Sequence, residues 1–472
     1  MKIIINPLLK KFYKIFEEHG FEAYLVGGAV RDILLKKPCS DWDVATNATP
    51  EQVMSIFKFV VPTGIAHGTV TVHFCNSEIE VTTFRTESDY SDGRHPDTIY
   101  YAATIEEDLS RRDFTMNAIA VNLKNGNIID PFGGKKDIRK KIIRTVGNPS
   151  DRFLEDGLRP VRALRFASKL NFVIEKHTFS EISKLEVINK IKSISLERFR
   201  DEFIKMMTSD KPSVGLKLME KTGILEIFIP ELTYCRGCIQ GDERGYHDFD
   251  VLDHLFYACD GAPSSKIKVR LAALFHDIAK PLTKKIVNTT DKKTVSEKSD
   301  SIANKDEIYT FYNHDIVSSE VTQNILRRLK FSNEEIFHIS HLIKNHMFHY
   351  EPSWSDAAVR RFIVRVGLDY INDLFDLRVA DVYGMHNNPV NLRKSYTSEN
   401  LLELQDRINK ITEKQNALSL KDLAINGKDL ISLGFEPGKK LGTILNELFE
   451  VVLEDPEMNC REKLLNIAQT FR

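Results

Sequence analysis

Two aspartates separated by one residue, Asp41 and Asp43, stand at the start of a run of strand-forming residues, 42–46. Side chains alternate along an extended strand, so residues two apart project from the same face. Two carboxylates on one face repel each other unless a cation lies between them, and Mg²⁺ takes oxygen ligands that it shares with a triphosphate. The pair therefore predicts a magnesium site, although a lone Asp-x-Asp is more often a solvated strand edge.

A glycine pair precedes the aspartates in the stretch LVGGAVRD, residues 25–32. The pattern predicts a strand that ends at Gly27 and Gly28 and enters a helix. Glycines let a backbone approach a phosphate closely, and a helix N-terminus offers free N–H groups. Arg31 adds a charge-assisted contact to the same phosphate. Alone, such a turn is purely structural in roughly half of cases.

Together, the glycine pair, the arginine and the strand-borne aspartates resemble the polymerase-β-like nucleotidyltransferase superfamily. Within it, GGAVRD and SDWDVAT are similar to class II tRNA CCA-adding nucleotidyltransferases and bacterial poly(A) polymerases. The resemblance implies Mg²⁺ as cofactor on Asp41 and Asp43, and contacts of Arg112 and Asp113 with the nucleotide's sugar and phosphates. Further matching stretches are residues 67–70, 80–85, 107–118, 130–134 and 423–442.

A second motif places Asp156, Arg159, Arg162 and Arg165 at successive spacings of three. On a helix these side chains drift around a wide face, and the bland interpretation is a charged helix with internal ion pairs. A guanidinium is a fork of donors and a carboxylate is a pure acceptor, so together they complement the pairing edges of cytosine and adenine. In the resembled family an E-D-x-x-R motif does this, which implies that Asp156 and Arg159 read the base. Pro160 departs from the family pattern and predicts a late helix start or a kink.

The stretch 89–97 between these motifs is polar and rich in turn residues, which predicts a mobile loop. The resembled family needs a loop here to add the terminal A, and CC-only relatives have it shortened. Its full length in this chain favours addition of C, C and A.

Histidines and aspartates recur in the second half of the chain in the order H…HD…D. This order resembles the HD superfamily of metal-dependent phosphohydrolases, which implies His254, His276, Asp277 and Asp381 as ligands of a transition-metal ion. His314 and His346 match positions that hold a second metal. Related CCA-adding enzymes with HD domains hydrolyse phosphate esters, including cyclic phosphates, whereas other HD-like bodies serve only as RNA-binding scaffold. Both alternatives stay open.

The composition is that of a large globular chain without an overall charge signature. Lys+Arg is 66 and Asp+Glu is 67, so an RNA enzyme with this balance must concentrate its cations on one face. We interpret the basic cluster at 135–144 as a solvated helical face in preference to an RNA contact. The six scattered cysteines favour a reducing cytoplasm, the lone CxxC at Cys235 and Cys238 is weak support for zinc, and no apolar run predicts a membrane span.

The expected fold class is α+β, with a polymerase-β-like head built on a small mixed sheet and followed by all-α elements. We expect the head at 1–150, a helical neck at 151–230, an HD-type body at 231–395 and a helical tail at 396–472. Residues 288–306 are polar without apolar spacing and predict an exposed insertion.

The predicted function is CCA tRNA nucleotidyl transfer, with tRNA, CTP and ATP as partners. A poly(A) polymerase would share both head motifs but incorporate no C, and a CC-only or A-only enzyme would stop short. An HD phosphohydrolase with a vestigial head is the alternative from another class, and the intact GGAVRD and DWD stretches argue against it.

Overall fold

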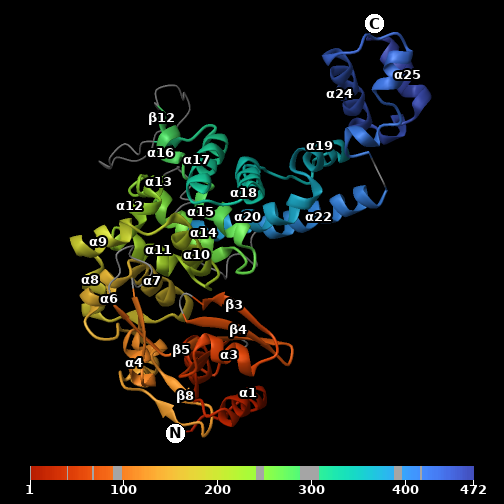
Figure 1. The fold of residues 1–472 in the computed structure, drawn as a ribbon. Coiled ribbons are helices and arrows are strands. Elements are labelled where there is room, and N and C mark those ends of the chain that lie inside the picture. Colours follow the sequence, from red (N-terminus) through yellow and green to blue (C-terminus); the bar gives the residue numbers. More distant parts are fainter. Residues whose placement is uncertain are drawn as a thin grey trace, which may run out of the picture. The chain divides into compact units, whose positions relative to one another are not determined.

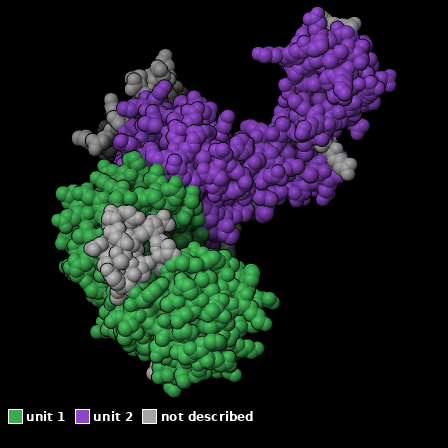
Figure 2. All heavy atoms as spheres, viewed as in Figure 1, with its two compact units in different colours: residues 1–230 green, residues 231–472 purple. Residues whose placement is uncertain are grey.

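The computed structural model describes residues 2–39, 41–65, 68–88, 98–240, 249–287, 308–386, 396–414 and 417–471. The chain divides into two compact units, residues 1–230 and 231–472 (Figures 1 and 2). The 89–97 loop and the 288–306 insertion predicted from the sequence lie outside the described residues.

A seven-stranded sheet in the order β3-β4-β5-β2-β1-β8-β9 lies in the N-terminal part of the first unit (Figure 1). Its strand β2 pairs antiparallel with β1 and parallel with β5, so the sheet is mixed. The hairpin of β4 and β5 turns at Cys75 and Asn76, which both have positive φ. The seven strands are β1 (Ala23–Val26), β2 (Trp42–Thr46), β3 (Val60–Gly64), β4 (Thr69–Phe74), β5 (Ser77–Thr83), β8 (Ala120–Asn122) and β9 (Ile128–Ile129).

Helix α1 (Pro7–Glu18) covers the sheet through its apolar stripe, as its spacing predicts. Phe12 stacks on Phe57 with ring centroids 4.7 Å apart, and Phe16 lies 5.3 Å from the same ring. The remaining elements of this unit are α2 (Gly27–Leu34), α3 (Pro50–Ile56), β6 (Arg85–Ser88), β7 (Thr98–Tyr101), α4 (Ile105–Ser110), η2 (Thr115–Asn117), α5 (Gly134–Lys140), β10 (Ile142–Ile143), α6 (Pro149–Glu155), α7 (Leu158–Leu170), β11 (Val173–Ile174), α8 (Lys176–Ile182), α9 (Leu185–Lys192), α10 (Leu196–Met207), α11 (Pro212–Lys221) and α12 (Ile224–Phe228), and α13 (Pro230–Thr233) follows at the boundary.

The second unit is almost wholly helical in its described parts (Figure 1). One short hairpin, β12 (Lys285–Val287) with β13 (Ile308–Thr310), flanks the insertion. The other elements are α14 (Val251–Gly261), α15 (Ile267–Phe275), α16 (Lys280–Thr283), α17 (His314–Arg328), α18 (Asn333–Asn345), α19 (Asp356–Val366), α20 (Leu368–His386), α22 (Tyr396–Glu413), η4 (Leu420–Asp422), α23 (Gly427–Ser432), α24 (Lys439–Glu454), η5 (Pro456–Met458) and α25 (Arg461–Gln469).

The expected α+β class with a small mixed sheet followed by helices is confirmed. Among the described helices, none is both long and apolar enough to cross a membrane. The finer division into head, neck, body and tail stays a prediction.

Candidate functional site

The carboxylate of Asp43 lies on β2 directly across from Glu80, because β2 and β5 run parallel in register. Asp41 immediately precedes β2 and is exposed. Burial raises the pKa of Asp43 to about 6, and the nearby charges of Glu80 and Asp41 act in the same direction. Arg112 and Arg31 oppose this rise. Burial and the charge of Asp41 also raise the pKa of Glu80. The charges of neighbouring acids therefore disfavour the ionised forms of Asp43 and Glu80, a situation that a bound cation relieves.

The carboxylate oxygens of these acids do not lie as close together as the ligands of a bound metal ion. Within the described ranges, the groups with three possible ligand atoms within 4.8 Å of one another both lie in the second unit. Cys235 and Cys238 are buried and belong to neither group.

Gly27 opens α2 with φ of 67°, and its backbone lies against the acidic strand. A Cβ at this position would lie 3.1 Å from Asp43 Oδ2 and 3.2 Å from Arg112 Nη1. Gly28 has room, because its Cβ would meet only Arg31 Nη2, at 3.5 Å. One turn later, Arg31 donates to Asn117 Oδ1 at 2.9 Å and to Asp32 Oδ1 at 2.9 Å. The predicted glycine turn therefore lies in contact with both Asp43 and Arg31.

Gly27→Ala is expected to lower nucleotidyl transfer by about 100-fold or more, because the new methyl group strains the left-handed backbone and displaces Asp43 and Arg112. Gly20→Ala is the matched control and should cost less than about threefold, because Gly20 has the same left-handed backbone, with φ of 78°, but nothing lies within 4 Å of an added Cβ. Steady-state incorporation of labelled nucleotide into RNA measures both. Equal losses in the two variants would contradict the close-packing argument.

Arg112 and Asp113 face different neighbours. Arg112 pairs with the buried Asp108 at 3.0 Å, and its guanidinium lies beside Gly27. Asp113 is buried and accepts hydrogen bonds from Arg162 at 2.6 Å and from Asn117 at 3.1 Å. Burial alone would raise the pKa of Asp113, but the Arg162 guanidinium makes the net shift a lowering. Arg112 thus lies beside the acids, whereas Asp113 holds other side chains in place.

The predicted arginine helix is broken at its beginning. Helix α6 ends at Glu155 and α7 begins at Leu158, so Asp156 lies between the helices and its Oδ1 accepts from the Leu158 amide at 2.9 Å. Pro160 then falls in the first turn of α7, where a missing N–H costs nothing. A Cβ on Gly157 would lie 2.5 Å from the Lys190 carbonyl oxygen, which fixes this break against α9.

Each arginine of α7 has an acidic partner. Arg159 is buried, pairs with Glu155 at 2.5 Å and donates to the Arg111 carbonyl at 3.1 Å. Arg162 pairs with Asp113 and also lies 3.8 Å from the buried Glu202 of α10, which is the partner of Arg165 as well. All three guanidinium groups are therefore held by acids in this structure.

The sequence analysis missed three charged residues of this site, namely Glu80, Glu202 and Arg198. Glu80 faces Asp43 only through the parallel pairing of β2 and β5. Glu202 and Arg198 lie one turn apart on α10, and Arg198 holds Asp156 Oδ2 at 2.8 Å. The available signal was the spacing of four between Arg198 and Glu202, which places both on the face of one helix.

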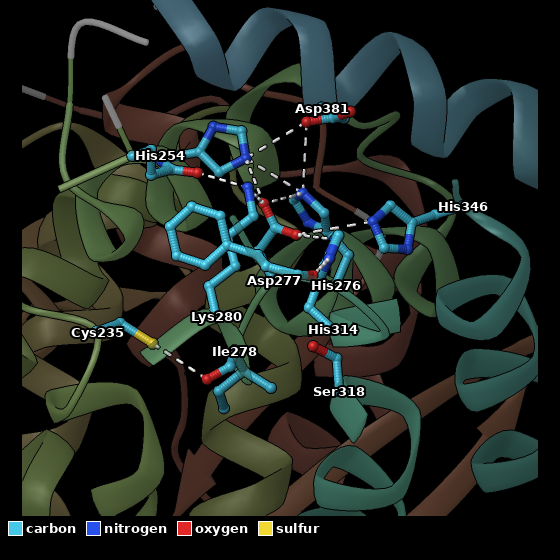
Figure 3. A network of polar contacts seen from close by, with 12 residues as sticks. Cys235, His254, His276, Asp277, Ile278, Lys280, His314, Ser318, His346 and Asp381 are labelled. Atoms are coloured by element: carbon cyan, nitrogen blue, oxygen red, sulfur yellow. Dashed lines mark hydrogen bonds and ion pairs between the residues drawn. The ribbon is translucent and has the colours of Figure 1, made fainter. Parts of the chain in front are cut away.

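In the second unit, the predicted histidines and aspartates converge on one buried centre (Figure 3). His254 comes from α14, His276 and Asp277 follow α15, and Asp381 lies on α20. The Nε2 atoms of His254 and His276 lie 3.3 and 3.4 Å from Asp381 Oδ1 and 3.4 and 3.3 Å from Asp277 Oδ2. His314 and His346 reach the other oxygen of Asp277, at 3.1 and 3.7 Å.

Backbone contacts orient the rings toward this centre. The Nδ1 atoms of His276, His314 and His346 lie 2.9, 2.7 and 2.6 Å from the carbonyls of Ala273, Phe311 and Ile343. Each Nδ1 therefore carries the proton, and each Nε2 presents a lone pair inward, as metal-binding histidines do. Within the described part of the chain, Asp277 Oδ1 and His314 Nε2 are buried without a hydrogen bond. The donor set fits a metal ion.

Close helix packing and electrostatics support the same conclusion. A Cβ on Gly384 of α20 would lie 2.8 Å from the His254 carbonyl, so this glycine lets α14 and α20 approach. Burial alone would lower the pKa of His276, but Asp277 and Asp381 raise it overall. Burial would raise the pKa of both aspartates, yet the facing histidines and cations hold it well below the usual range. The centre therefore attracts positive charge.

Known protein families match most of this chain. Residues 23–144 match the poly A polymerase head domain, and 171–235 match the probable RNA and SrmB-binding site of polymerase A. Residues 301–468 match the putative tRNA nucleotidyltransferase domain 2.

Curated relatives align over nearly the full chain. The CCA-adding enzyme of Ligilactobacillus salivarius is 33% identical over 98% of this chain and 95% of its own length. That of Enterococcus faecalis is 34% identical over 96% and 93%. That of Bacillus cytotoxicus is 48% identical over 206 residues, which are 44% of this chain and 51% of the relative.

Among solved structures, the Bacillus stearothermophilus CCA-adding enzyme in complex with CTP superposes with a TM-score of 0.71 and 26% identity, over 99% of this chain and 98% of that one. The Thermotoga maritima CCA-adding enzyme complexed with tRNA has a TM-score of 0.54 and 19% identity over 99% and 96%, and it supports the fold alone. The prediction of an RNA nucleotidyltransferase is confirmed by these relatives: this chain belongs to the family of CCA-adding enzymes.

Proposed function

We propose that this protein adds C, C and A to the 3′ end of tRNA from CTP and ATP, without a nucleic-acid template. The observation that carries the proposal is the half-buried carboxylate of Asp43, which faces Glu80 across parallel strands beside the Gly27 turn. Family membership over the whole chain supports CCA addition over a poly(A) polymerase.

Asp41 and Asp43 would hold Mg²⁺, with Glu80 as a neighbouring acid. When bound, Mg²⁺ lowers the pKa of the attacking 3′-hydroxyl and offsets charge on the departing pyrophosphate. Arg31 and the glycine turn face the triphosphate in this proposal, and Arg112 neutralises charge close to Asp43. The reaction breaks the bond between the α- and β-phosphates and forms a new phosphodiester bond at the 3′ oxygen.

Asp156 and Arg159 would read the base. Arg198 and the Leu158 amide fix the carboxylate of Asp156, which still has lone pairs for an exocyclic amino group. Both C and A carry such an amino group, whereas U does not. Arg159 must leave Glu155 in part to donate to a base.

The decisive test offers tRNA ending at the discriminator base with CTP and ATP, separately and together. We expect two C residues with CTP alone and CCA with both. A poly(A) polymerase would add no C, and a CC-only enzyme would stop after two residues even with ATP. An A-only enzyme would require a CC end.

A second candidate function is favoured by the histidine centre, where two groups of possible metal ligands lie together and Asp277 Oδ1 and His314 Nε2 are buried without a hydrogen bond among the described residues. We propose that the second unit has an HD-type metal-dependent phosphohydrolase site. His254, His276, Asp277 and Asp381 would hold one transition-metal ion, and His314 and His346 with Asp277 a second. Bound metal supplies a water of lowered pKa.

The four-part division at residues 150, 230 and 395 and a cytoplasmic location complete the proposal. Limited proteolysis followed by mass spectrometry tests the boundaries. Cuts should fall within a few residues of these positions or in the 288–306 insertion.

A further inference from the structure

Lys280 connects the histidine centre to Gln240. Its ammonium lies 2.6 Å from Asp277 Oδ2 and 2.5 Å from Gln240 Oε1. Both residues are buried, with 8% of Lys280 and 5% of Gln240 exposed. Lys280 lies at the start of α16, three residues beyond Asp277, and Gln240 precedes α14. The pair therefore borders the metal centre without supplying a ligand to it.

The orientation of the Gln240 amide follows from its partner. An ammonium only donates, so the atom that faces Lys280 must be the amide oxygen. This leaves Nε2 as a donor, and it is buried with no acceptor among the described residues. An unpaired buried donor costs about as much as a lost hydrogen bond, which indicates that an acceptor occupies this place in the functional state.

The charges of the centre call for an anion when metal is bound. Two carboxylates, Asp277 and Asp381, face two cations, Lys280 and Arg378, with Arg378 Nη1 lying 2.8 Å from Asp381 Oδ2. These charges balance, and the histidines are neutral when they bind metal. A divalent ion then adds uncompensated positive charge in a buried site, which is unfavourable without a counter-ion.

We propose that Gln240 and Lys280 form a subsite that binds the phosphoryl oxygens of the substrate at the metal centre. Gln240 Nε2 donates a hydrogen bond to one phosphoryl oxygen. Lys280 donates its remaining N–H to the phosphoryl group, and its positive charge attracts the anion. The ligand class is an anion with tetrahedral oxygens, namely a phosphate ester or inorganic phosphate. This inference rests on the proposed HD-type function and adds the residues that recognise the substrate.

Gln240→Glu provides a sharp test, because it keeps Oε1 opposite Lys280 and replaces only the donor with an acceptor. Gln240→Met removes both polar atoms without adding charge. Each full-length variant is loaded with Mn²⁺, its metal content is measured by elemental analysis, and its affinity for inorganic phosphate is measured by calorimetry. Incorporation of C and A into tRNA reports on the fold.

We expect both variants to keep their metal and to bind phosphate about 10- to 100-fold more weakly, the range for losing a hydrogen bond to a charged group. Phosphate affinity equal to that of the unaltered protein overturns the subsite. So does loss of metal from both variants, which would make Gln240 a support of the metal alone. If the unaltered protein binds no metal, the HD-type function itself fails, and this result is distinct from a failure of the subsite.

Discussion

Asp43→Asn is expected to abolish CCA addition, with incorporation of C and A reduced by about 1000-fold or more. Each tenfold in rate corresponds to ~1.4 kcal/mol, and a catalytic metal contributes several kcal/mol to stabilising the transition state. Asparagine keeps the shape of the side chain but not the negative charge that attracts the cation. Binding of tRNA, measured by filter retention, should stay within about threefold.

The same substitution should stabilise the metal-free protein. Burial, Glu80 and Asp41 raise the pKa of Asp43 to about 6 in the folded state, above its ordinary value of 3.8. The folded state therefore holds this proton more tightly than the unfolded state, and stability is lost as pH rises from about 4 to 6. Asparagine removes that loss, by about 1–3 kcal/mol at pH 7.5, since one pKa unit corresponds to ~1.4 kcal/mol.

This gain is measured by denaturant unfolding of the EDTA-treated protein at pH 4 and pH 7.5, followed by a signal from the first unit. The gain should appear at pH 7.5 and be largely lost at pH 4, where Asp43 is protonated in the folded state and about half protonated in the unfolded state. Glu78→Gln is the control. Glu78 lies on strand β5, as Glu80 does, but its side chain is exposed. A variant that is inactive yet no more stable at pH 7.5 would refute the crowding of negative charge around Asp43.

Local sequence was sufficient for the parts of the head whose partners lie close along the chain. The strand and glycine turn at 23–28 follow from a short apolar run that ends in two glycines. The parallel pairing that brings Glu80 opposite Asp43 joins residues far apart in sequence and has no turn to announce it. Parallel strands need a crossover whose length leaves the register open.

The arginine motif shows why spacing alone is insufficient for a site. Three-residue steps predicted neighbouring side chains on one helix, but the break at Gly157 removes Asp156 from that helix. Pro160 signalled the break. What sequence could not indicate is the choice of partner, because Glu202 and Arg198 come from α10 and become neighbours only after helices α7 and α10 pack.

The histidine centre was the reverse case. Its residues come from five separate segments, and only the resemblance to a known order of residues grouped them, since no periodicity links His254 to Asp381. The structure brings all six together, and it adds Lys280 and Gln240. A buried lysine three residues after an aspartate has a local signal, whereas Gln240 has none.

Asp277→Asn is expected to empty the second unit's metal centre while leaving CCA addition intact. Among the described residues, Asp277 is the one carboxylate in contact with His254, His276, His314 and His346, so it alone reaches both proposed metal positions. Replacing one oxygen with an amide weakens metal binding by at least about tenfold, comparable to the loss of a ligand's support. Hydrolysis of bis(p-nitrophenyl) phosphate should fall with the metal content.

The chain offers a matched control in another His-Asp dipeptide, His314–Asp315. Asp315 follows a residue of the centre just as Asp277 does, but its side chain lines a separate 290 Å³ pocket with Ile316 and His341. Asp315→Asn should therefore keep both the metal and the hydrolysis. Elemental analysis of the two variants, together with an assay of C and A incorporation, distinguishes a metal-binding role of Asp277 from a purely structural one. Retained metal in Asp277→Asn would show that the buried carboxylate serves the helix packing instead, and equal metal loss in both variants would point to a general disturbance of the second unit.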